Sequence, residues 1–300
     1  MSLRALRGLV AIGRHGGFAR AAEALGLTQA TISLRVKQLE EDLRVPLFDR
    51  SARSPQLTEA GLTVLRRAET ILTLYDNLAT ELSGDGPLTG TLDIGTIQTL
   101  QSGFLPQVLA TYRTDHPAVI PRVFSGMSNE LSQKVEQGEL DMALLTAPPR
   151  PPSDRLRFVE LFREPFYVLA PLSDAGKGDV DLLSSRPLIR MDKIAWAGRL
   201  IDQSLKDRDL FPQETMLLNT LTGTRDMVAS GLGVAIVPLN AQRKAETESQ
   251  CWLTPFGDPP LTRGLGMLER VDHPRRRLTA TLLELMQKRL AEESPPPAPP

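Results

Sequence analysis

Cysteine is almost absent from the sequence. The one cysteine among the 300 residues, Cys251, cannot form an internal disulfide bond, and a reducing compartment is expected. No apolar run approaches the roughly 18 residues that a membrane-spanning helix needs. Arginines interrupt the short apolar stretch near the N-terminus, and no small-residue cleavage site follows it, so no secretory signal is expected. We therefore predict a cytoplasmic protein with no membrane partner.

Histidine is also scarce, which limits the metal-binding and catalytic chemistry of the chain. His15, His116 and His273 show no metal-ligand spacing, and Cys251 has no histidine near it in sequence. The segment GLGVAIVP has two glycines but is not followed by the Gly-Lys-Ser of a phosphate-binding loop. The sequence thus predicts no metal site, no cofactor and no enzymatic activity.

The net charge of −1 is unevenly distributed along the chain. Residues 1–57 contain nine lysines and arginines against five aspartates and glutamates, so this segment carries +4 and the remainder −5. A basic N-terminal module on an acidic body suits a polyanionic partner. Random scatter of charges would give a similar excess, so the charge alone does not decide the function.

The N-terminal residues show the periodicity of short helices separated by turns. Apolar spacing predicts three helices, over residues 2–13, 18–25 and 28–43. Pro46 ends the third helix, and residues 45–58 predict a short two-stranded wing. Two helices joined by a glycine turn, here at Gly26, are a helix-turn-helix signature, in which the second helix enters the DNA major groove.

The polar face of this third helix differs from an ordinary solvated surface. Its core stripe consists of Ile32, Val36, Leu39 and Leu43. Off the stripe come small hydrogen-bonding residues and then cations, namely Gln29, Thr31, Ser33, Arg35 and Lys37. Short polar side chains recognise base edges, whereas cations contact phosphates. A plain surface helix is the alternative, but it would typically carry more glutamate and lysine over residues 29–33.

One long helix is predicted over residues 58–82. Apolar residues on it alternate spacings of three and four, at Leu65, Ala68, Leu72, Tyr75, Ala79 and Leu82. Such a heptad seam is typical of a helix that packs on another helix along its length. The segment SGDGPLTG follows, and its glycines and proline predict a hinge-like linker.

From residue 91 the pattern changes to alternating strands and helices. TLDIG, VIPRVFSG and LDMALLT predict strands separated by helices, and EPFYVLAP opens a second unit of the same kind. This order predicts an α/β fold with mainly parallel sheets. An amphipathic helix, RRRLTATLLELMQKRL, precedes a proline-rich tail over 291–300 that is expected to be disordered.

Taken together, these motifs resemble LysR-type transcriptional regulators over residues 2–290. The resemblance is carried by GFARAAEALGLTQATIS, QLEEDLRVPLFDR and LTEAG, and further along by GELDMALL and ASGLGVAIVP. It implies four segments: a winged helix-turn-helix over 1–57, a dimerising linker helix over 58–83, a hinge over 84–90 and an effector-binding domain over 91–290. That last domain is expected to have two lobes like a periplasmic binding protein, with lobe I over about 91–161 plus 266–290 and lobe II over about 162–265.

The resemblance also places DNA contacts on particular residues. The groove-facing positions are Thr28, Gln29, Ala30, Thr31 and Ser33. Contacts with phosphates or through the wing are expected from Arg35, Arg50 and Arg53. Two residues depart from the family pattern, because Ala30 stands where proline is common and Leu34 where arginine is common. Alanine is a good helix former and leaves the helix intact, whereas Leu34 removes an expected backbone contact.

A small-molecule site is expected where strands lead into helices. Ligands of open parallel sheets bind beyond the strand carboxyl ends, where helix N-termini present positive dipole ends. The hydrogen-bonding candidates at these junctions are Thr96, Gln98, Thr99, Ser102, Ser128 and Thr222. Arg190 offers a fixed positive charge, so a small organic anion is the expected effector. Helix capping is an equally good explanation for each hydroxyl, and an ion pair is the alternative for Arg190.

The expected function is therefore transcription controlled by a small-molecule effector. The resemblance implies a homodimer or homotetramer bound to a pseudo-palindromic operator in double-stranded DNA, with RNA polymerase as a further partner. A solute-binding or catalytic protein of the periplasmic-binding-protein fold is the alternative. The predicted DNA-binding module at the N-terminus argues against that alternative.

Overall fold

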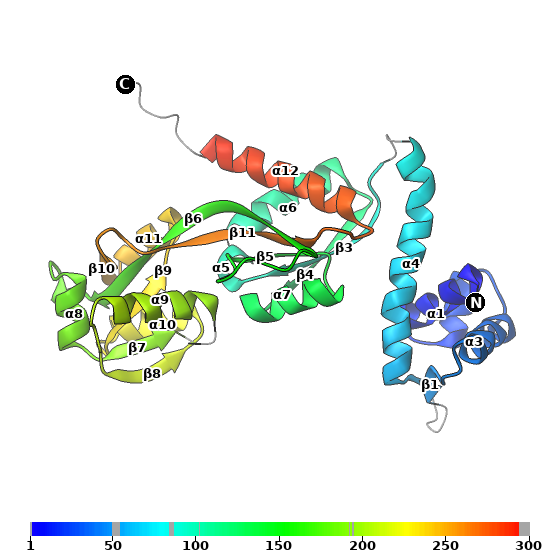
Figure 1. Ribbon diagram of the computed structural model, residues 1–300, viewed down its shortest axis with the longest axis horizontal. Helices are drawn as coiled ribbons and strands as arrows, with labels where there is room; N and C mark the ends of the chain where they lie inside the picture. Colours follow the sequence, from blue (N-terminus) through cyan, green and yellow to red (C-terminus); the bar gives the residue numbers. More distant parts are fainter. Residues whose placement is uncertain are drawn as a thin grey trace. The chain divides into compact units, whose positions relative to one another are not determined.

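The computed structural model describes residues 2–49, 55–83, 87–101, 103–191, 193 and 195–293 (Figure 1). The chain divides into two compact units, residues 1–87 and residues 88–300. Within the described part, no helix combines the length and apolar character needed to cross a bilayer.

The first unit is a small helical domain with a two-stranded wing. Its elements are α1 (Leu3–His15), α2 (Phe18–Ala24), α3 (Gln29–Leu43), β1 (Phe48–Asp49), β2 (Gln56–Leu57) and α4 (Glu59–Ser83). Side chains cap three of the helices: the backbone N–H of Ala5 donates to Ser2 Oγ at 3.3 Å, that of Thr31 to Thr28 Oγ1 at 3.2 Å, and that of Gly61 to Thr58 Oγ1 at 2.9 Å. Such caps satisfy first-turn N–H groups that the helix itself leaves without partners.

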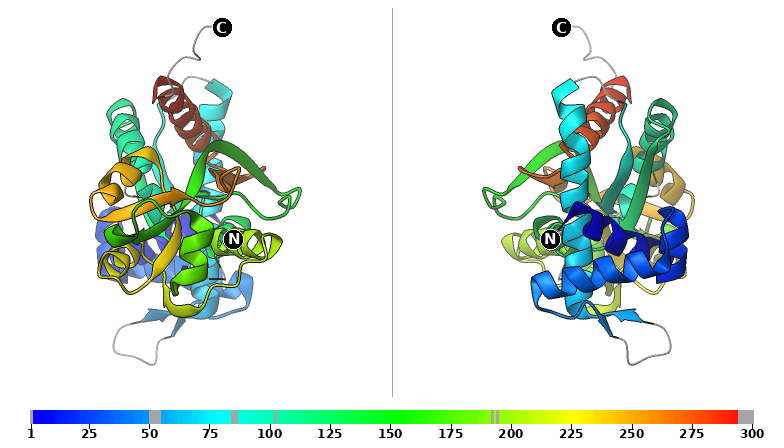
Figure 2. Two further views of the ribbon diagram at one scale, coloured as in Figure 1. Left: turned by 90° about the vertical axis from the view of Figure 1, so that its left-hand side faces the viewer. Right: turned by 90° about the vertical axis from the view of Figure 1, so that its right-hand side faces the viewer.

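Side chains from all four helices form the core of this unit. The members buried completely or nearly so include Leu6, Leu9, Ala21, Ile32, Val36, Leu39, Leu47 and Ala68. The helices α1 and α4 lie against each other, as the right-hand view of Figure 2 shows. Their approach is close, because a Cβ on Gly13 would come within 2.7 Å of the Leu65 side chain. A glycine inside α1 thus allows α4 to pack there.

This packing gives the first part of the heptad seam on α4 a partner helix within the same unit, namely α1. Ala68 and Leu72 belong to the seam, yet both are buried in the core of their own unit. The first half of the seam therefore packs within the chain and not on a second molecule. An apolar strip that consists of the seam residue Tyr75 with Ile71 and Leu74 stays open, since these side chains are between 37% and 50% exposed.

The second unit consists of two lobes joined by two long strands. The first lobe contains β3 (Gly90–Thr96), α5 (Gln98–Gln101), α6 (Phe104–Asp115), β4 (Val119–Ser125), α7 (Ser128–Gln137), β5 (Met142–Thr146) and α12 (Arg276–Glu293). The second contains η1 (Leu172–Asp174), α8 (Asp179–Ser185), β7 (Leu188–Met191), α9 (Trp196–Asp207), β8 (Glu214–Leu218), α10 (Leu221–Ala229), β9 (Val234–Pro238), α11 (Ala241–Glu248) and β10 (Cys251–Pro255). The joining strands are β6 (Leu156–Pro171) and β11 (Thr262–Arg270).

All strands of the second unit belong to one sheet with the order β4-β3-β5-β11-β6-β9-β7-β8, and β10 also pairs with β6. In the first lobe β3 runs parallel to β4 and β5, and in the second lobe β7 runs parallel to β8 and β9. The predicted α/β architecture with parallel strands is therefore present in both lobes. The joining strands β6 and β11 are antiparallel to each other and to β9 and β5.

Helices cover both faces of the sheet. In Figure 1, α6 and α12 lie together on one face of the first lobe and α7 lies on the other. The core between them includes Leu92, Ile94, Leu105, Val108, Tyr112, Leu144, Leu282 and Met286. The second lobe has a core on each side of its strands, one with α8 and α9 and one with α10. Parallel strands buried on both faces are expected for such crossover connections.

A buried polar cluster fixes the start of α12 on β11. The Glu269 side chain is 2% exposed and accepts hydrogen bonds from Thr279 Oγ1 at 2.6 Å and from the Arg157 guanidinium, while His273 Nε2 lies 3.1 Å away. Burial raises the pKa of Glu269, but hydrogen bonds from His273, Thr279 and Arg157 outweigh it and lower the pKa to about 2. The carboxylate is therefore charged at neutral pH, as its partners require.

Candidate functional site

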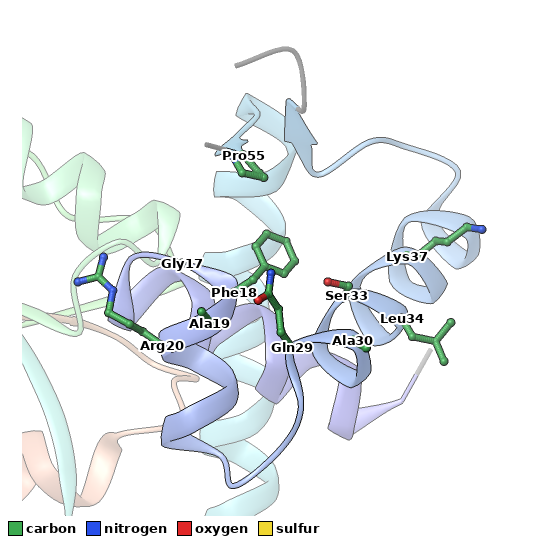
Figure 3. A pocket seen from close by; sticks show the side chains of 10 residues that line it. All are labelled: Gly17, Phe18, Ala19, Arg20, Gln29, Ala30, Ser33, Leu34, Lys37 and Pro55. Carbon is green, nitrogen blue, oxygen red and sulfur yellow. The ribbon is translucent and has the colours of Figure 1, made fainter. Parts of the chain in front are cut away.

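A groove of about 680 Å³ opens on the first unit between α2, α3 and the wing (Figure 3). It is lined by Gly17, Phe18, Ala19, Arg20, Gln29, Ala30, Ser33, Leu34, Lys37 and Pro55. In Figure 3 the Gln29 and Ser33 side chains point toward Phe18, whereas Leu34 and Lys37 extend outward from α3. One side of α3 therefore contributes five of the described residues that line the groove.

The core stripe of α3 determines which side chains face the groove. Three of its four predicted members, Ile32, Val36 and Leu39, are 0% exposed, so the helix cannot rotate without removing them from the core. The prediction was wrong for Leu43, which is 37% exposed at the end of the helix. Residues four apart on a helix lie on the same side. The exposed side accordingly carries two rows, a polar row of Gln29, Ser33 and Lys37 and an apolar row of Ala30 and Leu34.

The predicted DNA contacts are only partly brought together in this groove. Gln29, Ala30 and Ser33 line it, but Thr28, Thr31 and Arg35 do not. The Thr28 and Thr31 hydroxyl oxygens lie 2.8 Å apart in the helix cap. The Cβ of Arg35 is 4.0 Å from where a Cβ on Gly8 would stand, so this residue is on the side facing α1. Arg50 and Arg53 lie outside the described residues.

The cations that do line the groove are Lys37 and Arg20. Lys37 Nζ is 3.8 Å from Glu41, and its side chain is 65% exposed. Arg20 Nη2 donates to the carbonyl oxygen of Gly16 at 2.9 Å, which orients the guanidinium beside the end of α1. Arg20, in the first turn of α2, was not among the residues predicted from the sequence to contact DNA. A basic residue in the first turn of that helix was the signal.

A second site lies between the lobes of the second unit, as a cavity of about 140 Å³. Both lobes contribute to its wall. The polar residues that line it are Gln98, Thr99, Ser128, Thr146, Asn219, Thr220, Thr224 and Arg263. The apolar lining includes Ile97, Met191, Trp196, Leu218 and Leu221. A largely apolar wall with a few converging polar groups is typical of small-molecule sites.

Three helices begin at this cavity. The residues before and at the start of α7, α9 and α10 line it: Met127 and Ser128, Ala195 and Trp196, Thr220 and Leu221. Methionine and alanine cannot cap a helix through a side-chain oxygen, and the Thr220 side chain makes no capping hydrogen bond. At α9 and α10 the first-turn N–H groups and positive dipole ends therefore face the cavity without a side-chain oxygen as acceptor, whereas at α7 the Glu130 carboxylate accepts a hydrogen bond from the Met127 N–H at 3.5 Å.

Arg263 lines the cavity from β11, where the joining strands pass from one lobe to the other. It stands directly opposite Glu164 across β11 and β6, and the two side chains are 5% and 3% exposed. Its Nη2 and Nε donate to Glu164 Oε2 at 2.6 and 2.9 Å, and Nη2 also donates to Thr99 Oγ1 at 2.9 Å. The pair therefore holds the first lobe to the joining strands.

The predicted effector residues divide into two groups. Gln98, Thr99 and Ser128 line the cavity, although the Ser128 hydroxyl also accepts a hydrogen bond from the Thr146 N–H at 3.2 Å. Thr96 is fully buried and donates to the Ile97 carbonyl oxygen at 3.2 Å, outside the lining. Thr222 is not part of the lining, whereas its neighbours Thr220 and Thr224 are. Ser102 lies outside the described residues.

The structure corrects the expectation for Arg190. This arginine is 4% exposed and forms ion pairs with Asp202 and Glu214, away from the cavity between the lobes. Arg263 is the arginine that reaches the cavity, and the sequence reading missed it. The β11 strand that carries Arg263 was not among the predicted strands, so its position opposite Glu164 had no sequence signal. Among the described residues, no group of three histidine, cysteine, aspartate or glutamate side chains is placed to hold a metal ion.

These features define the class of the protein. One unit has a helix-turn-helix with a groove bordered by base-recognising and phosphate-binding side chain types, and the other has a largely apolar cavity with converging polar groups between two lobes. Such a combination is that of a DNA-binding transcriptional regulator with an effector-binding domain.

The comparisons with known proteins identify the family. Residues 3–62 match the family model of the bacterial regulatory helix-turn-helix protein, lysR family, and residues 85–291 match the LysR substrate binding domain. The chain therefore belongs to the LysR family of transcriptional regulators. It is 32% identical over 254 residues to a probable RuBisCO transcriptional regulator of Cyanophora paradoxa, covering 81% of this chain and 78% of that one.

Further similarity extends across the whole chain. The HTH-type transcriptional regulator CzcR of Bacillus cereus is 29% identical over 241 residues, with 80% of this chain and 81% of that one covered. The solved structure of a full-length OxyR variant from Pseudomonas aeruginosa matches with a TM-score of 0.71 and 26% identity, covering 100% of this chain and 99% of that chain. Both units of the fold are thus shared with characterised regulators.

The buried pair between the lobes leads to a prediction for stability. Arg263→Met leaves the Glu164 carboxylate buried without a partner, so it should lower the free energy of unfolding of the second unit by about 3–5 kcal/mol. The double variant R263M/E164M should recover most of that loss, because neither charge is then buried. Urea unfolding of the full chain, followed by circular dichroism, measures both.

Arg163→Met is the matched control for this experiment. Arg163 pairs with Glu160 on the surface, with side-chain exposures of 59% and 42%, so its loss should cost less than about 1 kcal/mol. A double variant as unstable as Arg263→Met alone would contradict the assignment of the loss to an unpaired carboxylate.

Proposed function

We propose that the effector of this regulator is a compact organic anion bound in the cavity between the lobes. The observation that carries the proposal is the convergence of the N-termini of α7, α9 and α10 at the cavity, where the first turns of α9 and α10 have no side-chain cap. Helix N-termini are effective anion sites because their N–H groups and their dipole act together. A carboxylate would complete the hydrogen bonding of these first turns.

Arg263 does not give the cavity a net positive charge, because Glu164 is paired with it. Glu164 neutralises its guanidinium, so the preference for an anion comes from the helix ends and Arg263 chiefly orients the ligand. Its Nη1 makes one long hydrogen bond, 3.4 Å to Thr146 Oγ1, and retains capacity to donate to a ligand. The cavity volume of about 140 Å³ is below the roughly 300–1,000 Å³ of sites for drug-sized ligands, which favours an effector of few atoms.

Titration calorimetry of the full chain tests this proposal with small mono- and dicarboxylates and with their uncharged amides. We expect carboxylates to bind and the matching amides to bind at least tenfold more weakly. An amide has no negative charge for the helix ends to stabilise, and it has one acceptor oxygen where a carboxylate has two. Binding by neutral or cationic compounds alone would refute the anion assignment.

Two threonines, Thr220 before α10 and Thr222 within it, provide matched variants that test where the acid binds. Thr220→Ala removes a hydroxyl from the cavity wall and should weaken binding by about 0.5–1.5 kcal/mol. Thr222→Ala, outside the wall, should leave the affinity unchanged. Equal losses from both variants would show that the acid binds elsewhere.

For the DNA-binding unit, we propose that Gln29 and Ser33 recognise base edges while Lys37 and Arg20 contact phosphates. The support is that all four line one groove and that the core stripe fixes their direction. Glutamine pairs with adenine through two hydrogen bonds, and serine serves several bases. Residues 1–57 would thus form the DNA-binding module.

Gln29→Ala tests base recognition in fluorescence anisotropy with the intergenic DNA next to the gene. Affinity for that DNA should fall by about 1–3 kcal/mol, while affinity for random-sequence duplex stays nearly unchanged. Gln38→Ala is the control, because Gln38 is on the same helix but does not line the groove. Equal losses of Gln29→Ala on both DNAs would argue against base recognition by this residue.

We further propose that the protein associates with itself through the open strip of α4, formed by Ile71, Leu74 and Tyr75. An exposed apolar strip on a long helix is suited to burial against the same strip of a second copy. Two copies related by a two-fold axis would present two groove faces to a pseudo-palindromic operator. Contact with RNA polymerase stays a prediction of the family resemblance.

A further inference from the structure

The apolar row of α3 is the unusual feature of the groove. Leu34 is 67% exposed, which makes it the most exposed large apolar side chain that the structure describes in the first unit. A single exposed leucine needs no explanation by itself. The position of Leu34 does need an explanation, because this side chain lines the groove next to the polar row of α3. It extends outward from the helix near Lys37 (Figure 3).

The two rows of α3 offer different chemistry to a base pair. An A·T pair shows the major groove a donor and an acceptor on adenine, and an acceptor and a methyl group on thymine. The polar row, with Gln29, can bind the adenine edge. The apolar row has no hydrogen-bonding atom, so it would leave a polar base edge unsatisfied, whereas a thymine methyl group matches it.

We propose that Leu34, with Ala30 one helical turn before it, is a specificity-determining residue that recognises the C5-methyl group of thymine in the operator. This inference rests on the proposed docking of the groove face into duplex DNA. Lys37 follows Leu34 by three residues on the same side of the helix. Its ammonium group can bind a phosphate and so hold the DNA close enough for Leu34 to touch a thymine methyl group. The chain then selects thymine at the bases that Leu34 meets.

Replacement of thymine by uracil tests the proposal, because it removes the methyl group and retains every hydrogen-bonding atom of the base. The probe is a duplex enriched from a random-sequence library by the full-length protein, prepared with thymine or with deoxyuridine at single positions. Wild-type protein should lose about fourfold in affinity at each contacted position, which is the effect of one buried methyl group. Leu34→Ala should bind the two duplexes equally well.

A leucine elsewhere on α3 provides the matched control. Leu43 is 37% exposed and does not line the groove, so Leu43→Ala should keep the wild-type ratio between thymine and uracil duplexes. Because both variants meet the same two duplexes, any effect of uracil on DNA shape cancels between them. Leu34 is exposed, and its replacement by alanine should leave the unfolding midpoint unchanged.

The outcomes separate this inference from the proposed function. If wild-type protein enriches no duplex, docking of the groove face fails and the inference fails with it. If wild-type protein binds but does not distinguish thymine from uracil at any position, DNA binding stands and recognition by Leu34 is overturned. A Leu34→Ala variant that keeps the full wild-type ratio would likewise overturn it and assign the methyl contact to another residue.

Discussion

The burial of one stripe of α3 is the constraint on which the DNA-binding unit depends. Ile32, Val36 and Leu39 are completely enclosed, so the helix has one orientation relative to α1 and α2. Every property of the groove follows from that orientation, because it decides that Gln29 and Ser33 face outward and that Arg35 lies toward α1. Side chains recognise bases only when a rigid element holds them in register, and a packed helix is such an element.

In the second unit, the parallel βα order has the corresponding role. It directs the N-termini of α7, α9 and α10 to one point between the lobes, where the first turns of α9 and α10 have no side-chain caps. The Arg263–Glu164 pair stands where β6 leaves its pairing with β11 and begins to pair with β9. A buried, hydrogen-bonded pair at this junction also touches Thr99 of the cavity wall. The pair thus connects the cavity wall to the point where β6 passes from the first lobe to the second.

Much of this architecture could be predicted from the sequence, because helical and strand periodicity is local. The α3 stripe, the glycine turn before it and the parallel units were recognisable for that reason. Contacts between distant segments were not. The seam residue Leu72 packs in the core of its own unit, and the sequence spacing alone does not distinguish that partner from a second molecule. Arg190 and Arg263 are both buried arginines, and only the pairing of β11 with β6 shows which one reaches the cavity.

The central claim is that the groove face of α3 docks into duplex DNA, and cysteine protection tests it most directly. The single natural cysteine, Cys251, is 1% exposed, and burial raises the pKa of its thiol, so it should react slowly. Ser33→Cys places a thiol in the groove, and Gln38→Cys places one on α3 outside it. Duplex DNA should slow maleimide labelling at position 33 by at least about tenfold and leave position 38 unaffected. Equal labelling rates at position 33 with and without DNA would contradict the account.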